Sequence, residues 1–251
     1  MEIREHRLGD MALRYEIDDD GCVGLLLYPS SMPLPGTLEK KRRTDPMVQV
    51  KIAGDVYNGC FAPGNTLRGS ESSFRLKFIS QEELVEEGVR TIVTVLRDSR
   101  GYSARHTVRY REGARFLTVL CSYLNESSEA VTLELLSSFS LGGISPYIPA
   151  DASGDITVHR LQSRWSQEGR LLSQTIEDLQ LESSWTLDAV RAERFGQVGS
   201  MPVSHYFPFL ALEDTRNHVF WGAQLACQSS WQMEIYRLDE AIAISGGLAD
   251  R

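Results

Sequence analysis

The sequence has few cysteines and no run of apolar residues long enough to cross a bilayer as a helix. Its cysteines stand far apart, without the short Cys–Cys or Cys–His spacings that bind zinc. We therefore expect buried, reduced thiols among apolar neighbours, and neither a metal ion nor any other cofactor. The residues concerned are Cys22, Cys60, Cys121 and Cys227.

The chain also lacks an excess of positive charge. Its 251 residues carry a formal net charge of −8, whereas a nucleic-acid-binding domain presents a basic surface to the phosphates. The four consecutive cations from Lys40 to Arg43 are interpreted as a solvated loop. The residues from Met1 to Arg7 are charged where a secretory signal needs an apolar stretch. We expect no nucleic acid and no membrane as partners, and a cytoplasmic location.

Signatures of common catalytic sites are missing as well. The five histidines form no His-Glu-x-x-His pattern, and the chain has neither a Gly-x-Ser-x-Gly elbow nor a glycine-rich phosphate loop. Glu213 and Asp214 are adjacent carboxylates between Leu212 and Thr215, a position that favours a hairpin turn over catalysis. The sequence therefore identifies no catalytic residue.

What the sequence does contain is alternation of apolar and polar residues, interrupted by short polar turns. Such alternation is typical of antiparallel strands with one face in a core and the other toward water. The segment from Gln81 to Glu87 is expected to form at most a short acidic turn of helix. We predict an all-β fold, with two large antiparallel sheets packed face to face. The clearest strands lie at residues 105–111, 117–123, 131–135 and 231–235, and residues 91–139 are predicted to form a four-stranded meander.

Two stretches rich in proline and glycine interrupt this pattern. Residues 28–46 are predicted to be a long surface connection, and residues 140–155 a second loop. A domain boundary would fit the second stretch, but strand patterning resumes after it. A single domain spanning residues 1–251 is the preferred interpretation.

One glycine-punctuated loop, residues 57–68, has the chemistry of sugar recognition. Aromatic faces suit the C–H surface of a sugar ring, and amide and guanidinium groups suit its hydroxyls. In the alternative interpretation the loop is a long hairpin connection whose aromatic residues pack locally. We expect the loop to be exposed and mobile. The candidate substrate-binding residues are Tyr57, Asn58, Phe61, Asn65 and Arg68.

Several segments share a pattern of aromatic residues and glycines that spans most of the chain. The pattern resembles the amino-terminal domain of glycoside hydrolase family 36, the bacterial α-galactosidases. The segments that carry the resemblance are Gly64–Arg68, Phe139–Gly143, Arg164–Arg170, Ser204–Leu212, Val219–Leu225, Ser229–Ile235 and Ile244–Leu248.

The resemblance implies a large antiparallel β-supersandwich of the galactose-mutarotase type that packs on a (β/α)₈ barrel. In that family the nucleophile and the acid/base of a retaining mechanism are aspartates on the barrel. Since this chain ends at Arg251, before such a barrel, we expect a non-catalytic domain. Its implied partners are the catalytic barrel of the parent α-galactosidase, a galactoside substrate such as melibiose or raffinose, and further copies in a homo-oligomer.

Two other functions remain open at this point. Mutarotases share the supersandwich architecture and need a histidine acid and a carboxylate base in one cleft. His159 or His205 is the candidate acid for a stand-alone aldose-1-epimerase of this kind. The third alternative is a free-standing carbohydrate-binding module.

Overall fold

The computed structural model describes residues 1–35, 44–57, 66–148, 154–183, 189–199, 204–227, 229–238 and 241–249. In this part the chain is nearly all β and its strands pair antiparallel, which confirms the predicted fold class. The chain divides into two compact units, Met1–Asn58 with Arg68–Gly142 and Gly59–Leu67 with Gly143–Arg251. The division after Gly142 falls in the glycine- and proline-rich stretch 140–155. The single domain over residues 1–251 stays a prediction.

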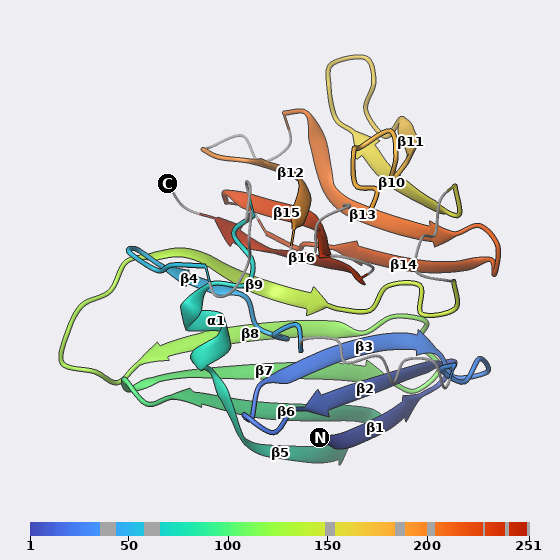
Figure 1. Cartoon of the computed structure of the whole chain (residues 1–251). Coiled ribbons are helices and arrows are strands. Elements are labelled where there is room, and N and C mark those ends of the chain that lie inside the picture. Colours follow the sequence, from blue (N-terminus) through green and yellow to red (C-terminus); the bar gives the residue numbers. More distant parts are fainter. Residues whose placement is uncertain are drawn as a thin grey trace. The chain divides into compact units, whose positions relative to one another are not determined.

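The first unit contains a three-stranded sheet in the order β1-β2-β3, a four-stranded sheet in the order β5-β6-β7-β8, and the pair β4-β9 (Figure 1). Its elements are β1 (Glu2–Leu8), β2 (Met11–Ile17), β3 (Val23–Pro29), β4 (Val50–Ile52), α1 (Glu71–Arg75), β5 (Lys77–Glu86), β6 (Val89–Asp98), β7 (Tyr102–Arg111), β8 (Thr118–Asn125) and β9 (Leu133–Leu141).

The core of the first unit lies between its two larger sheets. Alternation along β6 turns Ile92 and Leu96 inward, where they join Leu13 and Tyr15 of β2 and Leu25 of β3 in one cluster. Each of these side chains is nearly inaccessible to water. Burying one large apolar side chain stabilises a fold by about 1.5–3 kcal/mol, so the cluster accounts for the face-to-face packing of the sheets.

Two titratable side chains on strand β7 and its neighbour β8 belong to the inner face. His106 and Cys121 are register partners. Neither ring nitrogen of His106 has a hydrogen-bond partner among the described residues, and the side chain is 1% exposed. Burial lowers the pKa of His106 to about 4. Burial likewise raises the pKa of the Cys121 thiol, and that of Cys22 just before β3, to about 12.

Two predictions about this unit are wrong in detail. The segment from Gln81 to Glu87 lies mostly in strand β5, because residues Lys77–Glu86 pair along β6. This strand is an edge strand with most of its side chains in water, so its composition gives no apolar alternation. The predicted four-stranded meander of residues 91–139 is correct for β6, β7 and β8 only. Strand β9 pairs with β4 instead, and the fourth strand of the sheet is β5.

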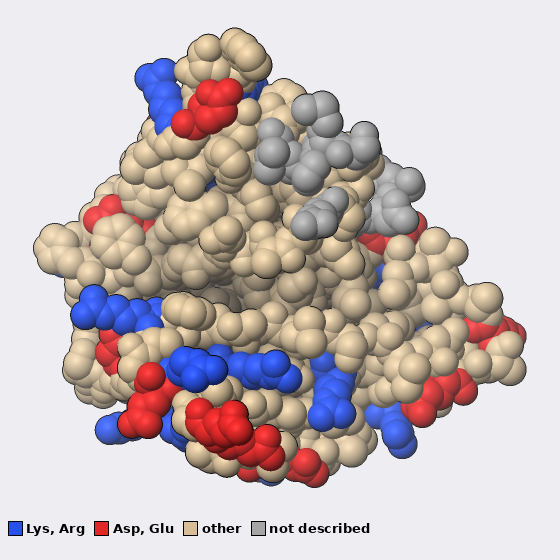
Figure 2. Space-filling view, turned by 180° about the vertical axis from the view of Figure 1, so that it is seen from behind, with Lys and Arg blue, Asp and Glu red and all other residues tan. Residues whose placement is uncertain are grey.

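The outer face of the β5–β8 sheet carries charged side chains. In Figure 2, which shows the molecule from behind, basic side chains form a row beside a group of acidic ones on the lower part of the surface. By register and exposure, the outward positions of β7 include Arg105 and Arg109, and those of β5 include Glu82 and Glu86.

The second unit has a four-stranded sheet in the order β11-β10-β13-β14, and the strands β12, β15 and β16, of which β15 pairs with both others. All pairs are antiparallel. The strands are β10 (Ile156–Gln162), β11 (Leu171–Thr175), β12 (Val190–Gln197), β13 (Tyr206–Asp214), β14 (Val219–Gln224), β15 (Trp231–Leu238) and β16 (Ala241–Ala249).

Aromatic side chains and one arginine build the core of the second unit. Trp231 is 1% exposed, and its ring meets that of Phe195 edge-on at a centroid distance of 5.8 Å. The Arg160 guanidinium lies over the rings of Phe195 and Tyr206, at 5.3 and 5.0 Å. Glu193 accepts a hydrogen bond of 2.7 Å from Arg160 Nη1. The charge of this buried arginine is therefore balanced by a carboxylate and two aromatic faces.

Across the residues that the structure describes, no helix is both long and apolar enough to span a membrane.

Candidate functional site

The two ends of the candidate sugar-binding loop are held together by backbone contacts. Tyr57 forms an isolated antiparallel bridge with Ser70, and Glu71 N donates a 2.9 Å hydrogen bond to Val56 O. Tyr57 is half-buried at this closure. The candidate residues Asn58, Phe61 and Asn65 lie outside the described residues.

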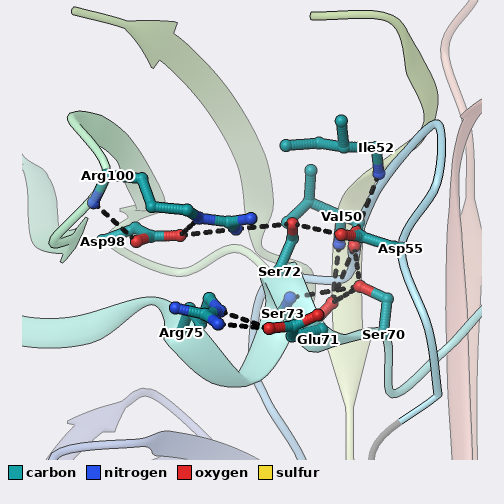
Figure 3. Close-up of polar contacts among 10 residues, drawn as sticks. All are labelled: Val50, Ile52, Asp55, Ser70, Glu71, Ser72, Ser73, Arg75, Asp98 and Arg100. Atoms are coloured by element: carbon teal, nitrogen blue, oxygen red, sulfur yellow. Dashed lines mark hydrogen bonds and ion pairs between the residues drawn. The ribbon is translucent and has the colours of Figure 1, made fainter. Parts of the chain in front are cut away.

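The short helix α1 follows this closure and is fixed by buried serines (Figure 3). Ser70 is the N-cap, and its hydroxyl accepts a hydrogen bond of 3.2 Å from Ser73 N. The Ser73 hydroxyl accepts from Val50 N at 2.9 Å and donates to Val50 O at 3.0 Å. These bonds satisfy the polar groups of Val50 on one side of β4, so they attach α1 to that strand.

A chain of polar contacts extends from α1 to the β6–β7 turn (Figure 3). Ser72 Oγ donates to Asp55 Oδ1 and accepts from Arg100 Nη2, both at 2.9 Å. Arg100 in turn donates to Asp98 Oδ2 through Nε at 2.9 Å and Nη2 at 2.7 Å. Partial burial disfavours the Arg100 charge, but the hydrogen bonds and charge of Asp98 raise its pKa overall. Ser72 is 1% exposed and out of reach of a substrate, so the chain is interpreted as structural.

Arg68 is buried, so the expected exposure is wrong for this residue of the loop. Its side chain is 1% exposed, and Nη2 donates to Asp45 Oδ2 at 2.5 Å. The next residue is fixed too, since Gly69 N donates to the buried Gln49 Oε1 at 2.8 Å. The guanidinium that we assigned to a sugar hydroxyl is thus engaged by a carboxylate of its own unit. Substitution of Arg68 is therefore expected to lower the melting temperature, because it removes a buried ion pair.

Glu234 is a second anchor of this loop that the sequence did not reveal. It lies on β15 and is 1% exposed. Its carboxylate accepts hydrogen bonds from the Thr66 hydroxyl and from Leu67 N, the latter at 3.2 Å. Alternation with Met233 and Ile235 suggested a solvent-facing glutamate, but β15 is buried on both faces.

The structure also brings together a histidine and a carboxylate on the four-stranded sheet of the second unit. His159 Nε2 lies 3.0 Å from Glu213 Oε2, and Nδ1 lies 2.8 Å from Ser173 Oγ. The ring of Phe220, 59% exposed, lies 6.2 Å away between centroids. The side chain of Glu213 on β13 therefore contacts the neighbouring strand β10, and Glu213 itself precedes the hairpin turn. Only its neighbour Asp214 stabilises the turn, by accepting from Asn217 N at 2.8 Å.

The other candidate acid has a different setting. His205 Nδ1 lies 2.9 Å from the hydroxyl of its neighbour Ser204. No group of three or more His, Cys, Asp and Glu side chains within the described segments is arranged to hold a metal ion. Of the two proposed histidines, His159 alone is given a carboxylate partner by the contacts between described residues.

Comparison with known protein families and with curated proteins found no match to this sequence. Solved structures do match. The GH36 α-galactosidase AgaA of Geobacillus stearothermophilus superposes with a TM-score of 0.66 at 14% identity. The galactosidase domain of the α-galactosidase–sucrose kinase AgaSK gives 0.64 at 12% identity, and an AgaA variant in complex with raffinose gives 0.64 at 14% identity. The likeness is one of fold. Each comparison covers 98% of this chain and 37% of the other, so the chain spans just over a third of those proteins.

Proposed function

We propose that this chain is a non-catalytic β domain of a cytoplasmic α-galactosidase of the GH36 type, in which a separate barrel domain performs hydrolysis. The observation that supports this most is the extent of the fold likeness, 98% of this chain against 37% of each α-galactosidase. The domain supports the barrel and takes part in assembly of the enzyme. The galactoside is bound chiefly by the barrel, with Tyr57, Asn58, Phe61 and Asn65 as the candidate contacts from this chain.

Several carboxylates among the described residues already accept hydrogen bonds from other parts of the fold, which agrees with a supporting role. Asp55, Asp98 and Glu234 each accept hydrogen bonds within the fold, and the last two are 1% exposed. A retaining glycosidase needs two carboxyl groups about 5–5.5 Å apart on either side of an accessible sugar. Carboxylates that are buried and already bonded do not meet this need.

The isolated 251-residue chain is expected not to hydrolyse p-nitrophenyl α-galactoside, melibiose or raffinose. The test compares the purified chain with the product of the complete reading frame of its gene, and we expect turnover from the complete product only. A mock purification from the same host controls for a contaminating hydrolase. Turnover that follows the isolated chain through successive columns would refute the proposal, as would a complete product that is equally inactive on all three substrates.

A second candidate function, an aldose-1-epimerase, is favoured only by the His159–Glu213 pair. Catalysis would need an imidazole free to protonate the ring oxygen, but both nitrogens of His159 are engaged. We therefore expect α-galactose to mutarotate at the buffer rate with the protein present, as followed by polarimetry. An acceleration that disappears in both His159→Ala and Glu213→Gln, but not in His205→Ala, would establish the epimerase instead.

A further inference from the structure

Side chains of opposite charge occupy separate strands on the outer face of the β5–β8 sheet. Outward positions of the edge strand β5 hold Glu82 and Glu86, both exposed. Outward positions of β7 hold Arg105 and Arg109, also exposed. We call this surface, formed by the outward residues of β5 to β8, the charged face.

The acidic and basic rows of the charged face do not neutralise each other. Strand β6 lies between them, and neighbouring strands are about 4.8 Å apart, so the rows are separated by about 10 Å. None of these four side chains takes part in an ion pair with another described residue. In contrast, Glu83 points to the other side of β5, where Arg90 and His6 contact it. The charged face therefore presents unpaired charges of both signs.

Apolar groups occupy the spaces around these rows. Outward residues of β6 include Val89 and Val93, and a hollow of about 910 Å³ lies over them. Leu84 of β5 and Leu120 of β8 line the same hollow and are 51% and 65% exposed. An apolar centre with a polar rim is a feature of surfaces that contact another protein.

We propose that the charged face is a homotypic interface, where a second copy of this chain packs its own charged face. Two opposed surfaces of this kind are related by a two-fold axis in the plane between them. When the axis runs parallel to β6, the rotation leaves the position of each residue along the strand direction unchanged. It reverses the order of the strands, so β5 of each copy faces β7 of the other. The strand register then places Glu86 of one copy opposite Arg111 of the other. Glu82 of one copy lies opposite Thr107 of the other, between Arg105 and Arg109. Each acidic row thus meets a basic row, twice in the dimer.

The size of the charged face predicts a reversible dimer. Four strands about 4.8 Å apart, with about ten residues at about 3.4 Å each, cover roughly 600 Å² in projection. Stable interfaces bury about 800 Å² from each partner, so this one is at the lower end. Because its specificity comes from exposed charges, dimerisation weakens as salt screens them. This interface does not depend on the α-galactosidase proposal.

The test is a charge swap, followed by sedimentation equilibrium of the 251-residue chain in low salt. One variant carries Arg105→Glu with Arg109→Glu, and the other carries Glu82→Arg with Glu86→Arg. We expect the unaltered chain to dimerise. Each variant alone has a dissociation constant raised about tenfold or more, since like charges then face each other. An equimolar mixture of the two variants forms heterodimers again.

All four positions are exposed, so circular dichroism and the melting temperature should confirm that the variants fold. Arg115→Glu, in the turn between β7 and β8, is the matched control and should dimerise normally. The proposal is overturned by an unaltered chain that is monomeric at every concentration, by variants that dimerise as well as it does, or by a mixture that stays monomeric.

Discussion

Lowering the pH from 7 to 4 is expected to reduce the free energy of unfolding by about 3 kcal/mol through His106 alone. Burial holds the pKa of this histidine at about 4 in the folded protein, against an ordinary value of 6.5. The unfolded chain therefore binds the proton first as the pH falls. Neutral His106 makes its full contribution to the free energy of unfolding above pH 6.5. About 2 kcal/mol of this contribution is lost at pH 5, and the loss approaches its full value below pH 4.

The variant His106→Leu separates this effect from the titration of carboxylates. Its register partners Thr94 and Cys121 carry no charge that would stabilise an imidazolium. Leucine also removes two buried ring nitrogens that have no hydrogen-bond partner within the described segments. The variant should therefore be more stable than the original chain by about 2 kcal/mol at pH 5. Urea unfolding at several pH values measures the difference. The exposed His218, in a left-handed conformation with φ of 56° that asparagine tolerates, supplies the control His218→Asn. Equal pH dependence in His106→Leu and the original chain would contradict the prediction.

Replacing Asp45 with alanine is expected to destabilise the protein by about 3 kcal/mol. The change removes the carboxylate that accepts a hydrogen bond from the guanidinium of Arg68, whose side chain is 1% exposed. Asp45 itself is 28% exposed, which is why we expect the lower part of the range measured for buried ion pairs. At roughly 2–4 °C for each kcal/mol, the melting temperature should fall by roughly 6–12 °C.

A surface ion pair of the same unit provides the comparison for Asp45→Ala. Arg97 and Glu126 are both about half exposed and lie 3.9 Å apart. Their separation should cost at most about 1 kcal/mol, so Arg97→Ala should melt near the original temperature. Asp45→Asn, which keeps an acceptor for Arg68, should fall between the two. If Asp45→Ala and Arg97→Ala melt together, Arg68 does not depend on its carboxylate.

The sequence predicted strands best where only one face of the strand is buried. Alternation located β7, where every second residue from Tyr102 to Tyr110 is buried. It failed for the glutamate-rich β5, because an edge strand of this sheet needs no apolar face to pair with β6. It also missed the burial of Glu234, because the pattern of β15 was interpreted with one face toward water.

The candidate site was harder to predict because its contacts join residues far apart in the chain. Loop composition made Arg68 a candidate for sugar binding, but its side chain is buried and its partner Asp45 is 23 residues away in the chain. Likewise, Glu213 and His159 are 54 residues apart and meet only because β10 and β13 are neighbours. Local patterns report which residue types are present, whereas sheet order decides which of them touch.

Two thiols of the first unit, the buried Cys22 and the half-buried Cys121, allow its two layers to be probed separately by alkylation. Cys22 borders the β1–β3 sheet and Cys121 belongs to the β5–β8 sheet. With pKa values of about 12, neither offers the thiolate that an alkylating reagent attacks while the sandwich is closed. Each alkylation rate therefore measures how often water reaches that layer. Equal rates would mean that the layers part together, and unequal rates that one sheet loosens while the other stays closed.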